Sequence, residues 1–449
     1  MPEATRTDLY EVTMAMAYLD HGLTGEATFS LFVRSLPPER GFLVAAGLES
    51  VLDMLERYHM DAHDAAVLAH ALHRPVGDLA ALRGTRFTGS VRAIPEGRIA
   101  LANEPLLEVT APLPQAQLVE SMVLNRMSHQ TAVASKAARC VIAAAGRPVV
   151  DFSLRRTHGA EAADQAARLG CVVGFAATSN VEAAHRYDLP ATGTMAHSFI
   201  EAFEDERTAF RAFAASHPGP LTFLVDTYDT GSGTRHAAEV LKETGRAAGA
   251  AIRLDSGDLG DLAVRARGIL DGAGLPQVAI VASGGLDEYA IDTLVSRGAP
   301  IDTYAVGTKV GVSADAPYLD TAYKLVAYRG RPTMKLSTGK TTLPGPHQSW
   351  RRPGYTDLTG TLGESAPPGG EPLLETVMRD GRRTGPRPSQ AAAHRRFARD
   401  FAMLPAAARR VRSPDAPGTR LSPTLASLID QVRERLVAQE RDGHPPGGR

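Results

Sequence analysis

Seven short apolar runs between residues 149 and 309 constrain the fold of this chain more than any other feature of its sequence. Helical segments rich in Ala, Glu and Arg fill most of the gaps, and strands that alternate with helices predict βαβ units and a parallel sheet. Nearly every run ends in Ser, Thr, Asp, Arg, His or Gly. The runs are VVDFSLRR, CVVGFAATSN, PATGTMAHS, LTFLVDTYDT, AAIRLDSGD, VAIVASGG and IDTYAVGTK.

The polar ends of these runs indicate where a site forms. In a parallel α/β barrel, the carboxyl ends of the strands and the loops after them build the active site. An open doubly wound sheet is the competing architecture and also places ligands beyond the carboxyl ends. The chain contains no GxGxxG or Walker A pattern to support that alternative. We therefore expect an α/β fold with a parallel barrel and a site on its carboxyl rim.

The segments on either side of these runs have a mixed α/β pattern. Asp8 and Glu11 resemble a capping box at the start of a first helix, whereas Tyr10 lies off the apolar stripe of that helix. Short β-like runs (ATFSLFV, GSVRAI, PLLEVT) follow, helices are expected at 115–145, and SLIDQVRERLVAQ is typical of a late helix. The apolar residues at helical spacing in the first helix are Leu9, Val12, Met16 and Leu19.

Composition argues against several classes of function. The 49 basic and 50 acidic side chains give a formal net charge of -1, so no broad footprint for nucleic acid or an anionic membrane is expected. Only Cys140 and Cys171 occur, which excludes a disulfide framework and a four-thiolate metal site. Neither a secretory signal nor a membrane-spanning stretch is visible. We expect a reduced, soluble, cytoplasmic protein.

The string RLDSGD at the end of the fifth run combines a cation with two carboxylates. The planar guanidinium of Arg253 matches an anion such as a carboxylate. The carboxylates of Asp255 and Asp258 are suited to ribose hydroxyls or to a metal. An ion-pair turn at the surface is the alternative interpretation of the same string.

Two glycine-containing turns, SGG at 283–285 and GTK at 307–309, follow the last two runs. Glycine lets the backbone approach closely, so that N–H groups converge on phosphate oxygens at the start of a following helix. Tight strand-to-helix turns also use glycine. Because phosphate sites favour the last loops of an α/β barrel, the two successive turns predict a phosphate site.

Further polar residues are expected on the same rim. His197 in TGTMAHS suits an acid/base or phosphoryl-acceptor role there, although a lone histidine is more often structural. Arg155 and Arg156 add positive charge. Asp226 and Asp229 of VDTYDT suit a metal-bound diphosphate, but helix capping is the favoured interpretation. The histidines show no ligand spacing, so no zinc site is expected.

Together these segments resemble the nicotinate phosphoribosyltransferase family. The resemblance runs in consistent order from residue 7 to about residue 340, through TDLYEVTM, ERGFLVAAGLE, NEPLLEV, DFSLRR, GFAATSNV, GTMAHSF, VDTYDT, IRLDSGDL, GTK and YKLV. It implies an irregular, type II phosphoribosyltransferase-like α/β barrel with an α/β sandwich domain from the N- and C-terminal segments. The implied parts are an N-terminal α/β segment at 1–145, the barrel with the active site at 146–320, a C-terminal segment that packs with the N-terminal domain at 321–440, and a disordered tail at 441–449.

The resemblance also implies a reaction and its participants. Nicotinate and phosphoribosyl diphosphate would give nicotinate mononucleotide and diphosphate, with ATP hydrolysis through a phosphohistidine and with Mg²⁺ accompanying the diphosphate. No resident metal is implied, and a homodimer is expected. The resemblance implies that Tyr10 stacks on the pyridine ring in the neighbouring subunit's site and that Thr194 lines the pyridine pocket. It implies that Arg155 and Arg253 bind substrate anions, that Asp255 binds the ribose hydroxyls and that His197 is phosphorylated. The implied phosphate-binding residues are Ser283, Gly284, Gly307 and Thr308.

Several alternatives remain at the level of sequence. Ser179 is neutral where related nicotinamide-using enzymes carry an Asp, which favours a carboxylate acceptor. The departures SGG and DAPYLDTAYKLV leave room for a paralogue that uses nicotinamide or another aromatic acid. A non-catalytic nucleotide sensor on the same barrel is another alternative. The presence of His197, Arg253 and Asp255 argues against it, because a sensor does not need these residues. The related quinolinate enzyme lacks the His string, and a barrel aldolase would need a Schiff-base lysine in a persuasive setting.

Overall fold

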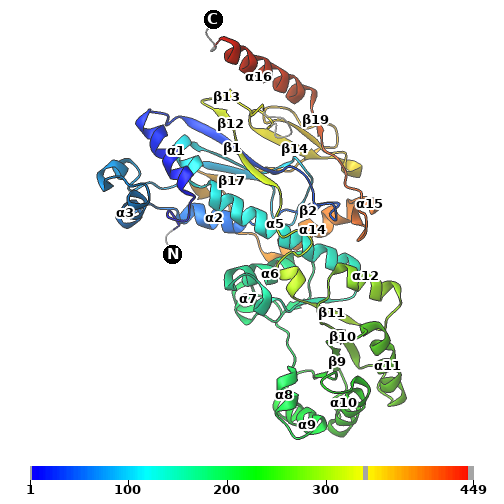
Figure 1. Cartoon of the computed structure of the whole chain (residues 1–449). Helices are drawn as coiled ribbons and strands as arrows, with labels where there is room; N and C mark the ends of the chain where they lie inside the picture. The colour runs from blue at the N-terminus through cyan, green and yellow to red at the C-terminus, as the bar shows by residue number, and fades with distance from the viewer. Residues whose placement is uncertain (1–2, 337–341, 443–449) are drawn as a thin grey trace, which may run out of the picture. The chain divides into compact units, whose positions relative to one another are not determined.

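The computed structural model of the chain describes residues 3–336 and 342–442, and these form two compact units (Figure 1). Unit 1 takes in residues up to 132, residues 318–410 and the chain from 414 onward, whereas unit 2 takes in residues 133–317 and 411–413. Most of the tail expected at 441–449 lies outside the described residues. Among those described, no helix is both long and apolar enough to cross a membrane.

Unit 2 is built on a parallel six-stranded sheet, as the alternating apolar runs predicted. Its strand order is β7-β6-β11-β10-β9-β8, and every neighbouring pair is parallel. All carboxyl ends therefore lie along one edge of the sheet. The strands are β6 (Val149–Asp151), β7 (Ala177–Thr178), β8 (Thr222–Leu224), β9 (Ala251–Leu254), β10 (Ala279–Ala282) and β11 (Thr303–Val306).

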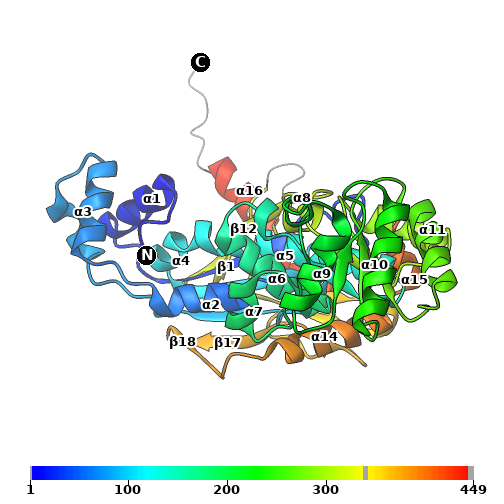
Figure 2. The same cartoon turned by 90° about the horizontal axis from the view of Figure 1, so that it is seen from below.

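Helices follow the strands of this sheet, and α9, α10 and α11 lie side by side (Figures 1 and 2). Several begin at an aspartate or asparagine whose side chain accepts a backbone N–H, which is the preferred chemistry for a helix start. The helices are α6 (Ala160–Val173), α7 (Val181–Tyr187), α8 (His197–Glu201), α9 (Glu206–Ser216), α10 (Thr230–Thr244), α11 (Leu259–Gly272), α12 (Glu288–Ser296) and α13 (Thr308–Gly311), with a 3-10 turn η2 at Leu154–Arg156.

Two of the predicted strands are wrong or shortened. PATGTMAHS forms no named strand and makes only one parallel bridge, between Ala191 and Thr178. Thr192 still donates its N–H to the Thr178 carbonyl, but Thr194 and Met195 accept hydrogen bonds from Arg253. In CVVGFAATSN, Cys-Val-Val belongs to the last turn of α6, where Val172 and Val173 are buried; the cap residue Gly174 follows with a φ of 110°, a conformation that favours glycine.

Unit 1 contains a seven-stranded antiparallel sheet in the order β13-β12-β1-β5-β3-β17-β18. β12 from the C-terminal half pairs with β1 from the N-terminal half, so both ends of the sequence share one sheet. Two smaller sheets, β16-β14-β15-β19 and β2-β4, complete the unit. The strands are β1 (Glu26–Val33), β2 (Leu43–Val44), β3 (Ser90–Ala93), β4 (Ile99–Ala100), β5 (Pro105–Pro112), β12 (Thr321–Tyr328), β13 (Arg331–Pro332), β14 (His347–Arg351), β15 (Leu358–Thr361), β16 (Glu371–Pro372), β17 (Glu375–Arg379), β18 (Arg382–Arg383) and β19 (Arg420–Leu421).

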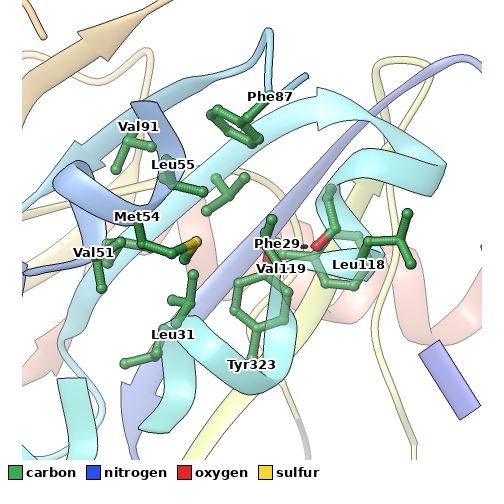
Figure 3. Packing of buried hydrophobic residues seen from close by; sticks show 14 of the residues in the cluster. Phe29, Leu31, Val51, Met54, Leu55, Phe87, Val91, Leu118, Val119 and Tyr323 are labelled. Carbon is green, nitrogen blue, oxygen red and sulfur yellow. Dashed lines mark hydrogen bonds between the residues drawn. The ribbon is translucent and has the colours of Figure 1, made fainter. Parts of the chain in front are cut away.

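Apolar side chains of these strands and of the neighbouring helices form the core of unit 1 (Figure 3). Phe29 of β1 stacks on Tyr323 of β12 with ring centroids 4.8 Å apart, and the buried Tyr323 hydroxyl donates to the Ala116 carbonyl. The described helices are α1 (Leu9–Asp20), α2 (Leu48–Arg57), α3 (Ala62–Ala71), α4 (Leu113–Leu118), α5 (Glu120–Ala143), α14 (Gln390–Met403), α15 (Ala406–Arg409) and α16 (Pro423–Asp442), with 3-10 turns at Val76–Ala81 and Pro353–Tyr355. Of these, α5 continues into unit 2.

The first helix exists as predicted, but its capping box does not form. Asp8 is the N-cap residue, yet its side chain accepts no N–H from the helix start. It accepts instead from the Ser121 hydroxyl, and the buried Glu11 accepts from the Ser121 N–H and hydroxyl. The apolar stripe is also shifted, because Leu9 is 51% exposed whereas Val12 and Met16 are buried.

A buried ionic network joins sequence-distant parts of unit 1. Arg98 pairs with Asp400 at 2.7 Å, and Arg351 pairs with both Asp400 and Asp357. Glu104 lies beside these groups, fully buried, and accepts from the Leu101 N–H. Burial and the adjacent charge of Asp357 raise the pKa of Glu104 to about 8, against the opposing effect of Arg351. Glu104 therefore stays protonated in the folded chain near neutral pH.

We predict that Glu104→Gln flattens the pH dependence of stability. The folded pKa lies above the ordinary value of 4.5, so the contribution of Glu104 is fully present below about pH 4.5 and is lost as the pH rises towards 8. One such proton changes the free energy of unfolding by up to about 1.4 kcal/mol per pH unit in that window. Denaturant unfolding at pH 5 and pH 8 measures it. Glu371→Gln, at the exposed edge of the network, is the control, and an unchanged slope in Glu104→Gln would contradict the assignment.

Candidate active site

The residues singled out in unit 2 lie at or just beyond the carboxyl ends of the parallel strands. Because those ends share one edge of the sheet, the loops after them are neighbours. The positions are Arg155 in η2 after β6, Ser179 after β7, Thr194 in the segment before α8, His197 as the first residue of α8, Arg253 on β9, Asp255 after β9, Ser283 and Gly284 after β10, and Gly307 and Thr308 after β11.

Arg253 is buried and donates to three segments of the chain. Its Nε donates to Ser283 Oγ at 2.8 Å, and its Nη2 donates to Asp255 Oδ1 at 2.6 Å. Its Nη1 donates to Thr194 Oγ1 at 3.0 Å and to the Met195 carbonyl at 3.4 Å. A guanidinium has five N–H donors in a fixed plane, so this side chain sets the relative positions of the loops after β9 and β10 and of the segment before α8.

Asp255 completes a cluster with Arg253 and Ser283. Its Oδ1 accepts from Arg253 and from the Ser283 hydroxyl, which lies 2.5 Å away. Burial raises the pKa of the Asp255 carboxyl, but the Ser283 hydrogen bond and the charges of Arg253 and His197 hold it below its ordinary value. Oδ2 accepts no hydrogen bond from the described part of the chain. The cluster thus presents a fixed anionic oxygen at the rim.

His197 lies beside that oxygen. Its Nε2 is 4.0 Å from Asp255 Oδ2, and its Nδ1 is 3.1 Å from Thr227 Oγ1. The side chain is 39% exposed, so solvent reaches part of the imidazole ring while Nδ1 contacts Thr227. A histidine whose Nδ1–H donates to a hydroxyl carries its lone pair on Nε2, which then serves as a base or nucleophile.

The two aspartates of VDTYDT have different environments. Asp229 is the N-cap of α10 and accepts from the Ser232 N–H, as predicted. Asp226 is not a cap, which corrects the helix-capping interpretation for that residue. Its Oδ2 accepts from the Asp255 N–H and the Ser256 hydroxyl, whereas its buried Oδ1 has no partner among the described residues.

The glycine turns bring backbone segments into close approach. Gly284 has a φ of 91°, and a Cβ placed on it would lie 1.9 Å from the Asp255 carbonyl oxygen. A Cβ on Gly307 would lie 2.9 Å from the Phe152 carbonyl oxygen. Lys309, at the end of the second turn, pairs at 2.7 Å with Asp287, the N-cap of α12. This ion pair joins the loops after β10 and β11.

Not every singled-out residue joins the Arg253 cluster. Arg155 is exposed in η2, and no hydrogen bond or ion pair of its guanidinium occurs within the described residues. Ser179 donates its N–H to the Asp151 carbonyl. Tyr10 belongs to unit 1, is 47% exposed on α1, and burial together with the charge of Glu120 raises the pKa of its phenol.

Sequence reasoning missed three residues at this edge of the sheet. Thr227 contacts His197, Asp151 holds the loops after β6 and β7, and the Phe152 ring lies under the Arg253 guanidinium, 5.4 Å from its central carbon. A signal for Asp151 was present, because it ends the apolar run VVD in the same way that Asp255 ends AIRLD. No comparable signal existed for Thr227 or Phe152.

Two family models match the chain. The model of the nicotinate phosphoribosyltransferase N-terminal domain matches residues 5–128, and the model of the nicotinate phosphoribosyltransferase family matches residues 148–297. A nicotinate phosphoribosyltransferase of Mycobacterium tuberculosis is 48% identical over 382 residues, which cover 84% of this chain and 82% of the relative. That of Bacillus subtilis is 42% identical over 354 residues, covering 77% and 72%. The crystal structure of human nicotinic acid phosphoribosyltransferase is similar with a TM-score of 0.83 at 29% identity, over 95% of this chain and 99% of that chain.

We predict that Gly284→Ala destabilises the protein far more than Gly285→Ala. Both glycines have positive φ, but nothing lies within 4 Å of a Cβ at Gly285. Gly285→Ala then lowers the free energy of unfolding by about 1–2 kcal/mol, because alanine must adopt a left-handed backbone conformation. Gly284→Ala carries the same penalty, and its methyl group also clashes with the Asp255 carbonyl, which lowers the free energy of unfolding by a further 1–3 kcal/mol, roughly, or more. Denaturant unfolding of both variants measures the difference. Equal losses would show that the close approach at Gly284 is absent in solution.

Proposed function

This chain belongs to the nicotinate phosphoribosyltransferase family, and we propose that it joins nicotinate to phosphoribosyl diphosphate, giving nicotinate mononucleotide and diphosphate in NAD biosynthesis. The observation that carries this proposal is the cluster of Arg253, Asp255 and Ser283 with His197 beside it. It presents a buried cation, a fixed anion and a reachable histidine at one edge of the sheet. A non-catalytic sensor would not require this combination.

In this proposal the free Oδ2 of Asp255 accepts from the ribose hydroxyls. The pyridine nitrogen already has a lone pair, so no general base is needed. The bond from that nitrogen to the anomeric carbon forms as the bond from that carbon to diphosphate oxygen breaks, and the electron pair leaves with the diphosphate. Positive charge develops on the ribose beside Asp255, so catalysis consists of positioning and of stabilising separating charge.

Arg253 is assigned to the acceptor or phosphate anion on chemical grounds. One Nη2–H has no partner among the described residues, while the other four N–H groups donate to Ser283, Thr194, the Met195 carbonyl and Asp255. A charge-assisted hydrogen bond from a pre-oriented guanidinium is strong and directional. We assign the phosphates of the ribose donor to the turns at 283–285 and 307–309, where glycine permits close backbone approach.

His197 is proposed to accept a phosphoryl group from ATP. With Nδ1–H donating to Thr227, Nε2 attacks the γ-phosphorus, and the bond between that phosphorus and the bridging oxygen of ADP breaks. The new phosphate lies next to Asp255, so its charge alters the field at the ribose and diphosphate positions. Hydrolysis of the phosphohistidine after transfer would then favour release of product.

Mg²⁺ fits the residues present at this edge. The Oδ1 of Asp226 is a buried carboxylate oxygen without a partner in the described chain. Mg²⁺ prefers oxygen ligands and is commonly held by one or two carboxylates together with substrate phosphates. Asp226 would hold an ion that arrives with the ribose donor. The ion would neutralise charge on the departing diphosphate.

The finer architecture belongs to the same proposal. We propose that the six-stranded sheet is part of an irregular barrel and that unit 1 is the sandwich domain expected from both ends of the chain. A homodimer would place Tyr10 of one subunit in the site of its partner. The exposure of Tyr10 and Leu9 on α1 is compatible with such a contact. The setting proposed for the reaction is the cytoplasm.

We predict that Ser179→Asp lowers kcat/KM for nicotinate far more than for nicotinamide. Two carboxylates about 4 Å apart repel by about 4 kcal/mol at an effective dielectric near 20, an upper-end figure. That corresponds to about a thousandfold in affinity. Steady-state kinetics on both acceptors measure the effect, with Ser179→Ala as the neutral control.

The same experiment tests the proposed function itself. The wild type is expected to form nicotinate mononucleotide and to prefer nicotinate strongly over nicotinamide. Equal losses on both acceptors in a folded Ser179→Asp variant would show that Ser179 does not face the acceptor. Comparable wild-type rates on both acceptors would overturn nicotinate as the substrate.

We predict that His197→Ala abolishes phosphorylation by ATP while a slow, ATP-independent transfer remains. Incubation with γ-labelled ATP should label the wild type in an acid-labile, base-stable form. His185→Ala, which removes an exposed histidine of α7, should label normally. Full labelling of His197→Ala would assign the phosphoryl acceptor to another residue.

A further inference from the structure

Asp151 makes two of the hydrogen bonds that hold the loop carrying Ser179. Ser179 donates its own N–H to the Asp151 carbonyl at 2.8 Å. Thr178, the preceding residue, donates its hydroxyl to Asp151 Oδ2 at 2.7 Å. Asn180, the following residue, donates its N–H to that Thr178 hydroxyl at 3.0 Å. Ser179 therefore lies between two residues that are both tied to Asp151.

Burial makes this arrangement rigid. Asp151, Thr178 and Asn180 are 1%, 0% and 2% exposed, whereas Ser179 is only partly buried. Leaving a buried polar group without its partner lowers the free energy of unfolding by about 1–3 kcal/mol. This penalty disfavours any conformation that breaks the hydrogen bonds from the Asn180 N–H to the Thr178 hydroxyl and from that hydroxyl to the Asp151 carboxylate. Ser179 is thus a partly exposed residue at the rim, flanked by the buried Thr178 and Asn180.

Asp151 also holds the loop after β6. Its Oδ1 accepts from the Ser153 N–H at 2.9 Å, which fixes the start of the loop that leads to Arg155. Phe152 lies between Asp151 and Ser153 in the sequence. Its ring lies under the Arg253 guanidinium, and its N–H donates to the Val306 carbonyl of β11. One carboxylate thus aligns the loop after β6 with the loop after β7.

We propose that Asp151 is a positioning residue for acceptor selectivity, which acts by holding Thr178 and thereby the Ser179 position against the carboxyl group of the acceptor. This inference rests on the proposed function and deepens it. Asp151 does not itself touch the substrate. It fixes where a neutral hydroxyl faces the ring substituent, and an error of about 1 Å in such a position is enough to reduce catalysis by about a hundredfold.

Three variants separate charge, hydrogen bonding and packing. Thr178→Val keeps the shape of the side chain but removes the hydroxyl, so both Asp151 Oδ2 and the Asn180 N–H lose a partner. Thr178→Ser restores the hydroxyl. Asp151→Asn accepts from Ser153 as before but leaves the hydrogen of the Thr178 hydroxyl without an acceptor.

Asp164→Asn is the matched control. Asp164 is also a buried carboxylate beside this loop, but it accepts from the Asn180 side chain at 2.9 Å and not from the backbone or hydroxyls around Ser179. Its substitution should reduce stability without changing which acceptor is preferred.

The measurement is kcat/KM for nicotinate and for nicotinamide, with the KM for phosphoribosyl diphosphate as an internal reference. Thr178→Val and Asp151→Asn should lower the nicotinate-to-nicotinamide ratio by about tenfold or more, with the KM for phosphoribosyl diphosphate unchanged. Thr178→Ser should recover the ratio. Thermal unfolding identifies any variant that is not folded. If Thr178→Val does not fold, Thr178→Ser and Asp151→Asn still test the inference.

The failures are distinguishable. If the wild type forms no nicotinate mononucleotide, the proposed function is wrong. A different result would overturn the inference while leaving the proposed function intact. In that case the wild type prefers nicotinate, and folded Thr178→Val and Asp151→Asn are less stable but keep the wild-type ratio of kcat/KM for nicotinate to that for nicotinamide, as Asp164→Asn should. Asp151 would then be only a structural residue.

Discussion

The guanidinium of Arg253 is the interaction on which the geometry of the candidate site depends. It extends from β9, between β10 and the edge strand β8, and reaches Ser283 after β10, Asp255 after its own strand, and Thr194 and Met195 before α8. Three segments of the chain are thereby held by one planar guanidinium. Against the effect of burial, the Ser283 hydrogen bond and the charges of Arg253 and His197 hold the pKa of the Asp255 carboxyl below its ordinary value.

The segment at 190–197 links this cluster to the acceptor side. It pairs with the edge of β7 through Thr178, meets Arg253 through Thr194, and ends at His197, which contacts Thr227. A change at His197 is therefore connected by a short, hydrogen-bonded path to Arg253 and to the loop that carries Ser179. In the proposed reaction, this path would be the physical route by which a phosphoryl group on His197 affects substrate binding.

The sequence allowed the parallel sheet and most of its polar rim to be predicted, because both follow from local periodicity and from the rule that carboxyl ends carry function. The helix cap at Asp229 followed from local chemistry as well. The role of Asp226 did not follow in this way, because its partners are the N–H of Asp255 and the hydroxyl of Ser256 in the loop after β9. PATGTM was apolar enough for a strand but leaves the sheet edge to reach Arg253. Such choices depend on tertiary contacts that no local pattern contains.

The same limit explains the first helix and the ionic network of unit 1. Asp8 and Glu11 have capping-box spacing, yet Ser121, more than a hundred residues later, takes their hydrogen bonds. Arg98, Arg351 and Asp400 meet only because the two ends of the chain share one unit. Asp151 was visible at the end of an apolar run, but its links to both Ser153 and Thr178 required the fold.

The central claim is that the edge around Arg253 and Asp255 binds the ribose donor while Ser179 faces the acceptor. A crystal structure of the protein with nicotinate mononucleotide tests it most directly. The account predicts a ribose hydroxyl within hydrogen-bond distance of Asp255 Oδ2, the phosphate against the turns at 283–285 and 307–309, and the pyridine carboxylate beside Ser179. A nucleotide bound elsewhere, or one whose phosphate lies at Ser179 and whose pyridine lies at the glycine turns, would contradict it.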